Sequence, residues 1–330
     1  MASEPVEMVR CPAGDQAEAL EVFCWRLSSR QRTEMANRLQ NEAKQGDLDL
    51  SHIWVARKSG LIVGVVLAQV YVGRTAAVWP PEVSPERLAG GLIWKSARNR
   101  VAAGLVRHAV GELGHAGIRV VQALLEWPVK AQQAADLKRG GMPHVTDLIY
   151  LSRPSADSGT PTRLATAALA WDTYRPETDA EFRRVLEATY QASLDMPELV
   201  GTRSLDDILA SHRATGHFAA KLWQIGHVPG EPGAAAVLLM LDRPDRDAIE
   251  VAYLGLTPDA RGRGLGRSTV QHAIEVARPL RSRVELAVDS RNTPARRLYL
   301  KTEFQPYESR SVHLAVFRDQ SPEGTPRGGC

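Results

Sequence analysis

Residues 250–267 contain residue types that bind phosphate groups, in the order that a strand, a turn and a helix start would place them. The loop at the end of this segment reads Arg261, Gly262, Arg263, Gly264, Leu265 and Gly266, followed by Arg267. Glycines lack a Cβ, so successive backbone N–H groups can converge there on an anion. A helix start adds unpaired N–H donors and partial positive charge, and the arginines add full charges. The segment therefore predicts a pyrophosphate-binding site.

Two other phosphate-binding motifs do not fit this loop. The dinucleotide fingerprint Gly-x-Gly-x-x-Gly fails because Gly262 and Gly264 are followed by Gly266 and then Arg267. A Walker A loop ends in Gly-Lys-Ser/Thr, which the segment lacks. The remaining alternative is a flexible arginine–glycine turn at a helix start, and a second motif downstream argues against it.

The second motif runs from Asn292 to Phe304, and together the two motifs resemble the GCN5-related N-acetyltransferase (GNAT) superfamily. The family's coenzyme motif is Arg/Gln-x-x-Gly-x-Gly/Ala after a strand ending in Val/Leu-x-Pro, and it is matched by Arg261, Gly264 and Gly266 after Leu256-Thr257-Pro258. The family's next motif is Asn-x-x-Ala-x-x-Leu-Tyr-x-x-x-Gly-Phe, and it is matched by Asn292, Ala295, Leu298, Tyr299 and Phe304. Glu303 stands where the family has glycine. The resemblance covers about residues 169–317.

The resemblance implies a donor, acetyl-CoA, and a binding geometry. Strands 248–256 and 284–288 are expected to splay apart and admit the pantetheine arm, with the backbone of residues 254–256 pairing with that arm. The residues expected to bind the coenzyme are Leu254, Leu256, Arg261, Gly262, Arg263, Gly264, Leu265, Gly266, Arg267 and Asn292. Asn292 is interpreted as ordering a helix start near the coenzyme. No metal is expected.

Acetyl transfer needs an amine that has lost its proton and a group that protonates the leaving thiolate. Tyr299 matches the position that donates this proton in many family members, and the ordinary pKa of a phenol, about 10, suits that role. The alternative for Tyr299 is an aromatic ring that only packs at a helix end. Glu250 stands where the histone-modifying branch keeps its general base, with a solvated or paired carboxylate as the equal alternative. Tyr253 and Asp289 are further candidates at strand ends.

The elements that must position these residues follow the order β-α-α-β-β-β-α-β-α-β-β in the second half. The expected ranges are 169–174, 179–192, a helix capped by Ser204, 218–225, 234–241, 248–256, 264–277, 284–288, 293–301, 304–307 and 312–317. Ser204 with Asp207 is a typical helix N-cap pair, and Pro294 suits a first helical turn.

The first half follows a similar order, with strands at 6–10, 53–57, 61–71, 75–79, 119–125 and 144–151 and helices at 16–44, 96–113 and 131–139. It lacks the Arg-x-x-Gly-x-Gly loop, and Asp136 is expected where the second half has Tyr299. The whole chain therefore resembles tandem GNAT proteins with a degenerate first copy, a mycothiol synthase-like architecture. The fold class is α/β (α+β), two tandem GNAT folds, each a mixed, mostly antiparallel twisted sheet flanked by helices. The expected divisions are 1–152, a linker at 153–163, a catalytic domain at 164–318 and a tail at 319–330.

Composition excludes several other classes of function. The 330 residues are 44% hydrophobic and 24% charged, which is typical of packed globular proteins. The net charge of +3 is spread along the chain, so no nucleic-acid partner is expected. The longest apolar stretch, 61–72, is too short to span a bilayer, and the N-terminus lacks a signal-peptide core. Cys11, Cys24 and Cys330 are too scattered for a disulfide framework, so a cytoplasmic protein is expected. His212 and His217 lack a third ligand for zinc.

These observations predict an acetyl-CoA-dependent N-acetyltransferase that moves an acetyl group to a primary amine by direct attack in a ternary complex. A small-molecule amine is the favoured acceptor, and a protein N-terminus, a lysine or a mycothiol-type cysteine-sugar amine stays open. Asp195, Glu198 and Arg203, between the first two helices of the second half, are the expected acceptor contacts. The alternatives are an inactive acyl-CoA-binding sensor or scaffold and an interaction module. A monomer or homodimer is expected, with no membrane partner.

Overall fold

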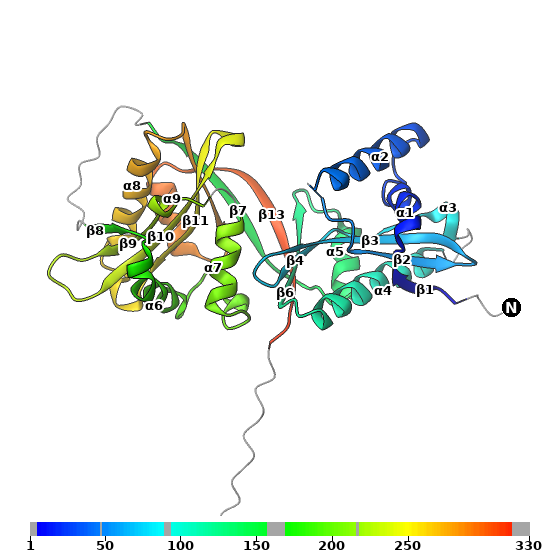
Figure 1. Cartoon of the computed structure of the whole chain (residues 1–330), viewed down its shortest axis with the longest axis horizontal. Helices are drawn as coiled ribbons and strands as arrows, with labels where there is room; N and C mark the ends of the chain where they lie inside the picture. Colours follow the sequence, from blue (N-terminus) through cyan, green and yellow to red (C-terminus); the bar gives the residue numbers. More distant parts are fainter. Residues whose placement is uncertain (1–4, 47, 89–93, 157–168, 216–217, 319–330) are drawn as a thin grey trace, which may run out of the picture.

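The computed structural model describes residues 5–46, 48–88, 94–156, 169–215 and 218–318. Two α/β halves lie side by side, and the long strands β7 (His144–Pro154) and β13 (Gln305–Val316) run between them (Figure 1). One sheet continues through both halves in the order β1-β2-β3-β4-β6-β13-β7-β12-β11-β10-β9-β8, with β5 paired to β3. Its pairs are antiparallel except for β4 with β6 and β11 with β12, so the sheet is mixed and mostly antiparallel, as predicted.

The first half contributes β1 (Glu7–Arg10), α1 (Gln16–Phe23), α2 (Ser29–Gln45), β2 (Ile53–Lys58), β3 (Leu61–Tyr71), β4 (Thr75–Val78), β5 (Glu82–Val83), α3 (Pro85–Leu88), α4 (Trp94–His115), β6 (Val120–Glu126) and α5 (Ala131–Arg139). The single helix predicted at 16–44 is wrong, because the chain turns at residues 24–28. Ser28 begins a new helix there, and its backbone N–H donates to the Oε1 of Gln31 at 3.3 Å.

The second half contributes β8 (Ala170–Thr173), α6 (Asp179–Tyr190), α7 (Leu205–Ala214), β9 (Trp223–His227), β10 (Ala234–Arg243), β11 (Ala248–Leu256), α8 (Leu265–Ala277), β12 (Arg283–Asp289) and α9 (Thr293–Lys301). The strand predicted from 218 begins only at Trp223, after a short 3-10 turn. The two strands predicted at 304–307 and 312–317 form one strand, β13, which two register shifts bend without interrupting it.

The two halves exchange their last strands. β7 pairs with β12, and the pairing runs from Leu148 opposite Asp289 to Pro154 opposite Arg283. β7 therefore extends the sheet of the second half. β13, the last strand in the chain, pairs with β6 and so extends the sheet of the first half. β7 includes residues 153 and 154 of the predicted linker, whereas residues 157–163 and the predicted tail at 319–330 lie outside the described residues.

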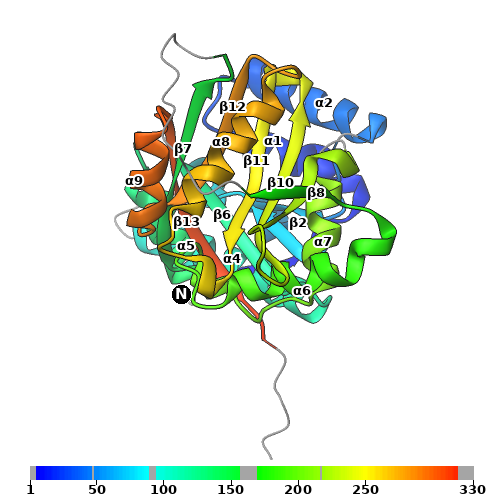
Figure 2. The same ribbon diagram turned by 90° about the vertical axis from the view of Figure 1, so that its left-hand side faces the viewer.

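In the second half, both faces of the sheet are covered by helices (Figure 2). Successive residues of β10 point to opposite faces, so Val237 and Leu239 pack with α6 and α7, whereas Leu238 and Met240 pack with α8 and α9. This burial on both faces explains why β10 is apolar from Ala234 to Leu241.

β11 and β12 are neighbours over only part of their length. Their parallel pairing begins at Ala248 and Arg283 and ends at Val251 and Leu286. A register shift opposite β10, between Leu239 and Met240, bends β11 at this point. Beyond Val251 the two strands separate, as expected, and the loop before α8 lies at the open end.

Candidate active site

The loop before α8 exposes a row of unpaired backbone donors. Gly262 and Gly264 have φ angles of +75° and +80°, and no atom lies within 4 Å of a Cβ added at either position. Among the described residues, the N–H groups of residues 262–266 have no hydrogen-bond acceptor. Because α8 begins at Leu265, its N-terminal positive charge is directed to the same place. The loop therefore forms a cradle for an anion. A Cβ at Gly262 or Gly264 would partly fill that cradle.

The three arginines of this loop have different surroundings. The guanidinium of Arg261 donates to the carbonyls of Leu256 at 3.2 Å, Ala192 at 3.2 Å and Thr189 at 3.0 Å. Arg261 thus fastens the loop to the end of α6, although a direct phosphate contact was expected. Arg263 is on the surface and pairs with Glu231. The Nε of Arg267 is buried without a partner among the described residues, which leaves a donor beside the cradle.

The other residues expected to bind the coenzyme have structural contacts. A Cβ on Gly266 would lie 3.2 Å from the Cδ2 of Leu298, so this glycine lets α8 approach α9 closely. Leu265 is buried, and Leu254 and Leu256 are half-buried on the separated part of β11. The Oδ1 of Asn292 accepts the N–H of Ala295 at 3.2 Å, so Asn292 caps α9, as interpreted from the sequence.

Two tyrosines, on α9 and β11, lie close enough to interact electrostatically. Tyr299 is 7% exposed, and no described residue hydrogen-bonds to its hydroxyl group. Burial, followed by electrostatic interactions with Asp195 and Tyr253, raises the pKa of Tyr299 above its ordinary value. The hydroxyl of Tyr253 contacts the Oγ1 of Thr189 at 2.8 Å, and burial raises its pKa to about 12. Thr189 already donates to Leu186, so Tyr253 is the donor in this pair and Tyr299 alone keeps a free proton.

Glu250 lies in the part of β11 that is still paired with β12. Its Oε2 accepts from Arg243 at 2.7 Å and from Arg246 at 3.1 Å. Of the two possibilities for this carboxylate, the structure shows a paired one.

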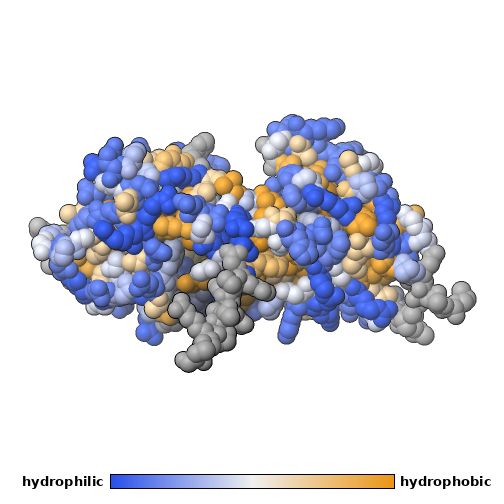
Figure 3. Space-filling model, turned by 60° about the horizontal axis from the view of Figure 1, so that its bottom comes forward, coloured by the Kyte–Doolittle hydropathy of each residue, from blue (hydrophilic) through white to orange (hydrophobic). Residues whose placement is uncertain are grey.

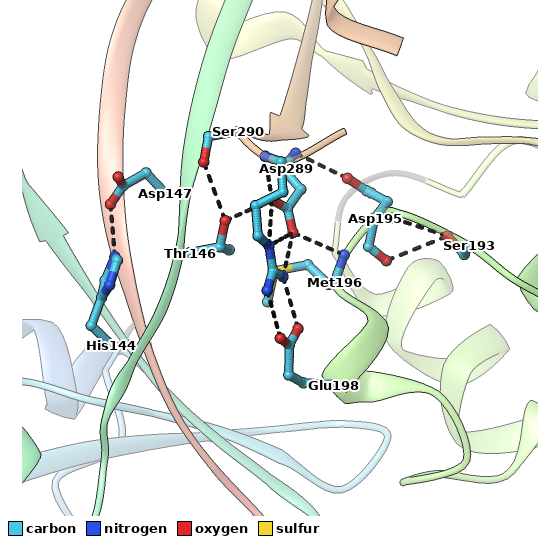
Figure 4. Close-up of polar contacts among 10 residues, drawn as sticks. His144, Thr146, Asp147, Ser193, Asp195, Met196, Glu198, Asp289 and Ser290 are labelled. Carbon is cyan, nitrogen blue, oxygen red and sulfur yellow. Dashed lines mark hydrogen bonds and ion pairs between the residues drawn. The ribbon is translucent and has the colours of Figure 1, made fainter. Parts of the chain in front are cut away.

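The loop after α6 is tied to the end of β12 through Asp289 (Figure 4). Asp289 is fully buried and accepts from the Oγ1 of Thr146 at 2.6 Å and from the N–H of Met196 at 3.1 Å. Arg291 pairs with Asp289 at 2.7 Å and also with Glu198 at 2.7 Å. These hydrogen bonds lower the pKa of Asp289 against the opposing effect of burial, so it is an ionised anchor.

The same loop presents Asp195 to the two tyrosines. Its Oδ1 accepts the N–H of Asp289 at 2.9 Å. Although Asp195 is an exposed residue, burial of its carboxyl group by the surrounding protein raises its pKa, and the charge of Asp289 adds to this effect. Met196, the next residue, has a left-handed φ of +47°, which is strained for a non-glycine residue. The sequence marked Asp195 only as an acceptor contact, and no motif indicated its place beside Tyr299.

The first half has no equivalent site among its described residues. Counting from the first residue of each helix, Leu137 on α5 takes the place of Tyr299 on α9, so the expected counterpart, Asp136, is wrong by one position. Gly141 and Glu303 confirm this alignment, because both have a left-handed φ two residues past the helix. Asp136 is instead fully buried in an ion pair with Arg98.

In the described part of the chain, no helix is long and apolar enough to cross a membrane. No group of three or more His, Cys, Asp or Glu side chains there is arranged to hold a metal ion.

Comparison with known proteins identifies the family. Residues 171–304 match the model of the acetyltransferase (GNAT) family. The chain is 32% identical over 206 residues to the mycothiol acetyltransferase of Beutenbergia cavernae, covering 59% of this chain and 67% of that protein.

Solved structures share the fold. The GCN5-related N-acetyltransferase from Sphaerobacter thermophilus superposes with a TM-score of 0.53 and 17% identity over 96% of this chain and 98% of that one. A GCN5-related glucosamine N-acetyltransferase region in a fungal multi-domain β-N-acetylglucosaminidase gives a TM-score of 0.53 and 18% identity over 95% of this chain and 38% of that one. The family match and the mycothiol acetyltransferase relative, which agree with the glycine cradle at the opening between β11 and β12, show that the chain belongs to the GNAT family and is an N-acetyltransferase.

Proposed function

We propose that the chain transfers an acetyl group from acetyl-CoA to the primary amine of a small molecule by direct attack in a ternary complex. The observation that carries this proposal is the unpaired row of N–H groups at residues 262–266, at the open end of the gap that also holds the free hydroxyl of Tyr299. The orphaned Nε of Arg267 and the open space over Gly262 and Gly264 fit a pyrophosphate group.

Each site residue has a defined part in this proposal. The backbone of residues 262–266 and the side chain of Arg267 hold the pyrophosphate, and the separated part of β11 lines the pantetheine arm. Bound acetyl-CoA supplies an activated acetyl group as a thioester. Tyr299 donates its proton to the leaving sulfur, because burial keeps the phenol protonated and no described residue hydrogen-bonds to its hydroxyl group.

The ammonium group of the acceptor must lose a proton before it attacks, and a carboxylate can take that proton. We assign this role to Asp195, because burial raises its pKa and because it lies close enough to both tyrosines to affect their pKa values. Glu250 is the other candidate, but its Oε2 already accepts hydrogen bonds from Arg243 and Arg246. The two can be separated by pH–rate profiles, since Asp195→Asn should remove the acidic limb and Glu250→Gln should leave it. The reverse result would return the role to Glu250.

Calorimetric titration with acetyl-CoA tests the coenzyme site. The wild type is expected to bind at micromolar strength and Gly264→Glu to bind no longer, because the new side chain occupies the anion cradle. Gly230→Glu is the matched control, since Gly230 also has a left-handed φ, +83°, and no atom within 4 Å of an added Cβ. Failure of the wild type to bind would refute the proposal.

Turnover distinguishes an enzyme from a sensor. Tyr299→Phe should reduce kcat by roughly 10²- to 10⁴-fold with acetyl-CoA affinity unchanged. Tight binding with no thiol release against a broad amine panel, and no effect of Tyr299→Phe, would instead support an acyl-CoA-binding sensor.

A further inference from the structure

A large cleft lies between the two halves, next to the site described above. It has a volume of about 1320 Å³, which exceeds the ~300–1,000 Å³ typical of small-molecule sites. β4, β6 and the start of α5 line one side, and α7 with the loop before it lines the other. Two of its lining residues connect the cleft to the active site. Arg243 pairs with Glu250, and Leu199 is next to Glu198. Figure 3 shows apolar surface gathered between the halves.

Aromatic rings line the first-half wall of this cleft. Trp79 follows the end of β4 and Trp127 follows the end of β6, and these parallel neighbours end at the same edge of the sheet. Trp127 is 58% exposed, Trp79 39% and Tyr71 48%, although large aromatic side chains are usually well buried. Exposed rings in a concave site offer flat faces against which a ring of a ligand can stack.

The cationic side chains of the cleft are only partly neutralised. Four of them line it, two of which have carboxylate partners: Arg243 with Glu250 and Arg310 with Glu308. Arg203 and Lys130 have no ion pair with any described residue. Glu126 is the carboxylate that lines the described part of the cleft.

Arg203 is held in place by neutral groups from both halves. Its NH1 donates to the carbonyl of Gly73 at 3.2 Å and to the Oγ of Ser211 at 2.8 Å. Its Nε and NH2 have no acceptor among the described residues. Burial lowers the pKa of Arg203, and the nearby Tyr190 and Asp207 oppose this effect only in part, as expected of a partly desolvated cation without a direct ion pair. A fixed guanidinium with free donors is suited to a carboxylate or phosphate group.

We infer that this cleft binds the acceptor, and that the acceptor is a ring-containing amine with a carboxylate or phosphate group that Arg203 recognises. The amine end reaches Asp195 and Tyr299, the ring lies against Trp79 or Trp127, and the anionic end meets Arg203. This inference rests on the proposed function and adds the chemical class of the substrate.

Binding is measured by quenching of tryptophan fluorescence with three probes: benzylamine, 4-(aminomethyl)benzoate and the corresponding arylphosphonate. The two anionic probes distinguish a carboxylate from a phosphate site. At least one should bind about tenfold more tightly than benzylamine, as expected for one charge-assisted hydrogen bond. Arg203→Gln should abolish this preference, and Arg203→Lys should keep part of it.

One variant controls for indirect effects. Arg184→Gln removes a surface arginine on α6 outside the cleft and should leave the preference unchanged. Equal binding of all three probes, or a preference that survives Arg203→Gln, would overturn the inference. Transfer to neutral amines without preference would overturn the inference and leave the proposed function standing. Anion binding without any acetyl transfer would refute the proposed function, and with it the acceptor role of the cleft, and would leave only an anion-binding site at Arg203.

Discussion

Gly73, in the turn between β3 and β4, is where the first half touches α7 of the second. Its φ is +85°, and an added Cβ would lie 2.1 Å from the Oγ of Ser211 and 2.2 Å from the carbonyl oxygen of Asp207. Gly60, in the turn between β2 and β3, has a similar φ of +81° but no atom within 4 Å of an added Cβ. The two glycines therefore differ in contact with the other half and not in backbone conformation.

This difference gives the magnitude expected for Gly73→Ala. The left-handed conformation costs an alanine about 1–2 kcal/mol at either position. At Gly73 the turn must also move by more than an ångström, because real Cβ contacts of 2.1 Å do not occur. That movement breaks the bond of Arg203 to the Gly73 carbonyl and that of Ser211 to the Val72 carbonyl, each worth about 1 kcal/mol. Gly73→Ala should therefore lose about 3–4 kcal/mol and Gly60→Ala about 1–2 kcal/mol.

Urea denaturation of both variants measures the two free energies of unfolding, and steady-state kinetics adds a second readout. Gly73→Ala should also raise the KM for the acceptor while leaving acetyl-CoA affinity unchanged, since the cleft between the halves widens and the glycine cradle does not. Equal destabilisation by the two substitutions would refute the close contact of the halves at this turn.

Three further predictions concern stability. Glu303→Gly should raise the free energy of unfolding in urea denaturation by about 1 kcal/mol, because Glu303 has a strained φ of +68° and its contact with Arg153, at 3.6 Å, is weak; a lower free energy of unfolding would contradict this. Asp136→Ala should cost about 3–5 kcal/mol, because Arg98 would be left buried without its carboxylate; an unchanged melting temperature would show that the pair is dispensable. Burial, followed by the charge of Arg203, lowers the pKa of His212 from 6.5 to about 4. The unfolded chain therefore binds this proton more readily than the folded chain, and the free energy of unfolding should fall as pH drops from 6.5 towards 4. His212→Gln should flatten that slope in denaturation measured across the pH range, and an unchanged slope would assign it to other groups.

Much of the fold could be predicted from local sequence patterns. β3, α5 and β11 begin and end at the predicted residues, because their apolar periodicity and flanking turn residues are determined locally. The glycine loop was predictable for the same reason, since the left-handed conformations of Gly262 and Gly264 depend on residue type.

Features that depend on distant partners could not be predicted. The sequence does not indicate that the guanidinium of Arg261 meets the end of α6. It also does not indicate that Asp195 lies near Tyr299. The same limit applies to β7 and β13, because a strand's alternation predicts that it pairs but not with which neighbour.

The exchange of β7 and β13 has a consequence for the order in which the chain can fold. β13 ends at Val316, near the C-terminus, yet it pairs with one side of β6, a strand of the first half. During synthesis, β6 must wait for nearly two hundred further residues, and its unpaired edge stays open to other chains. The first half therefore cannot reach its native state as an independent unit, and the two copies should unfold in one cooperative transition.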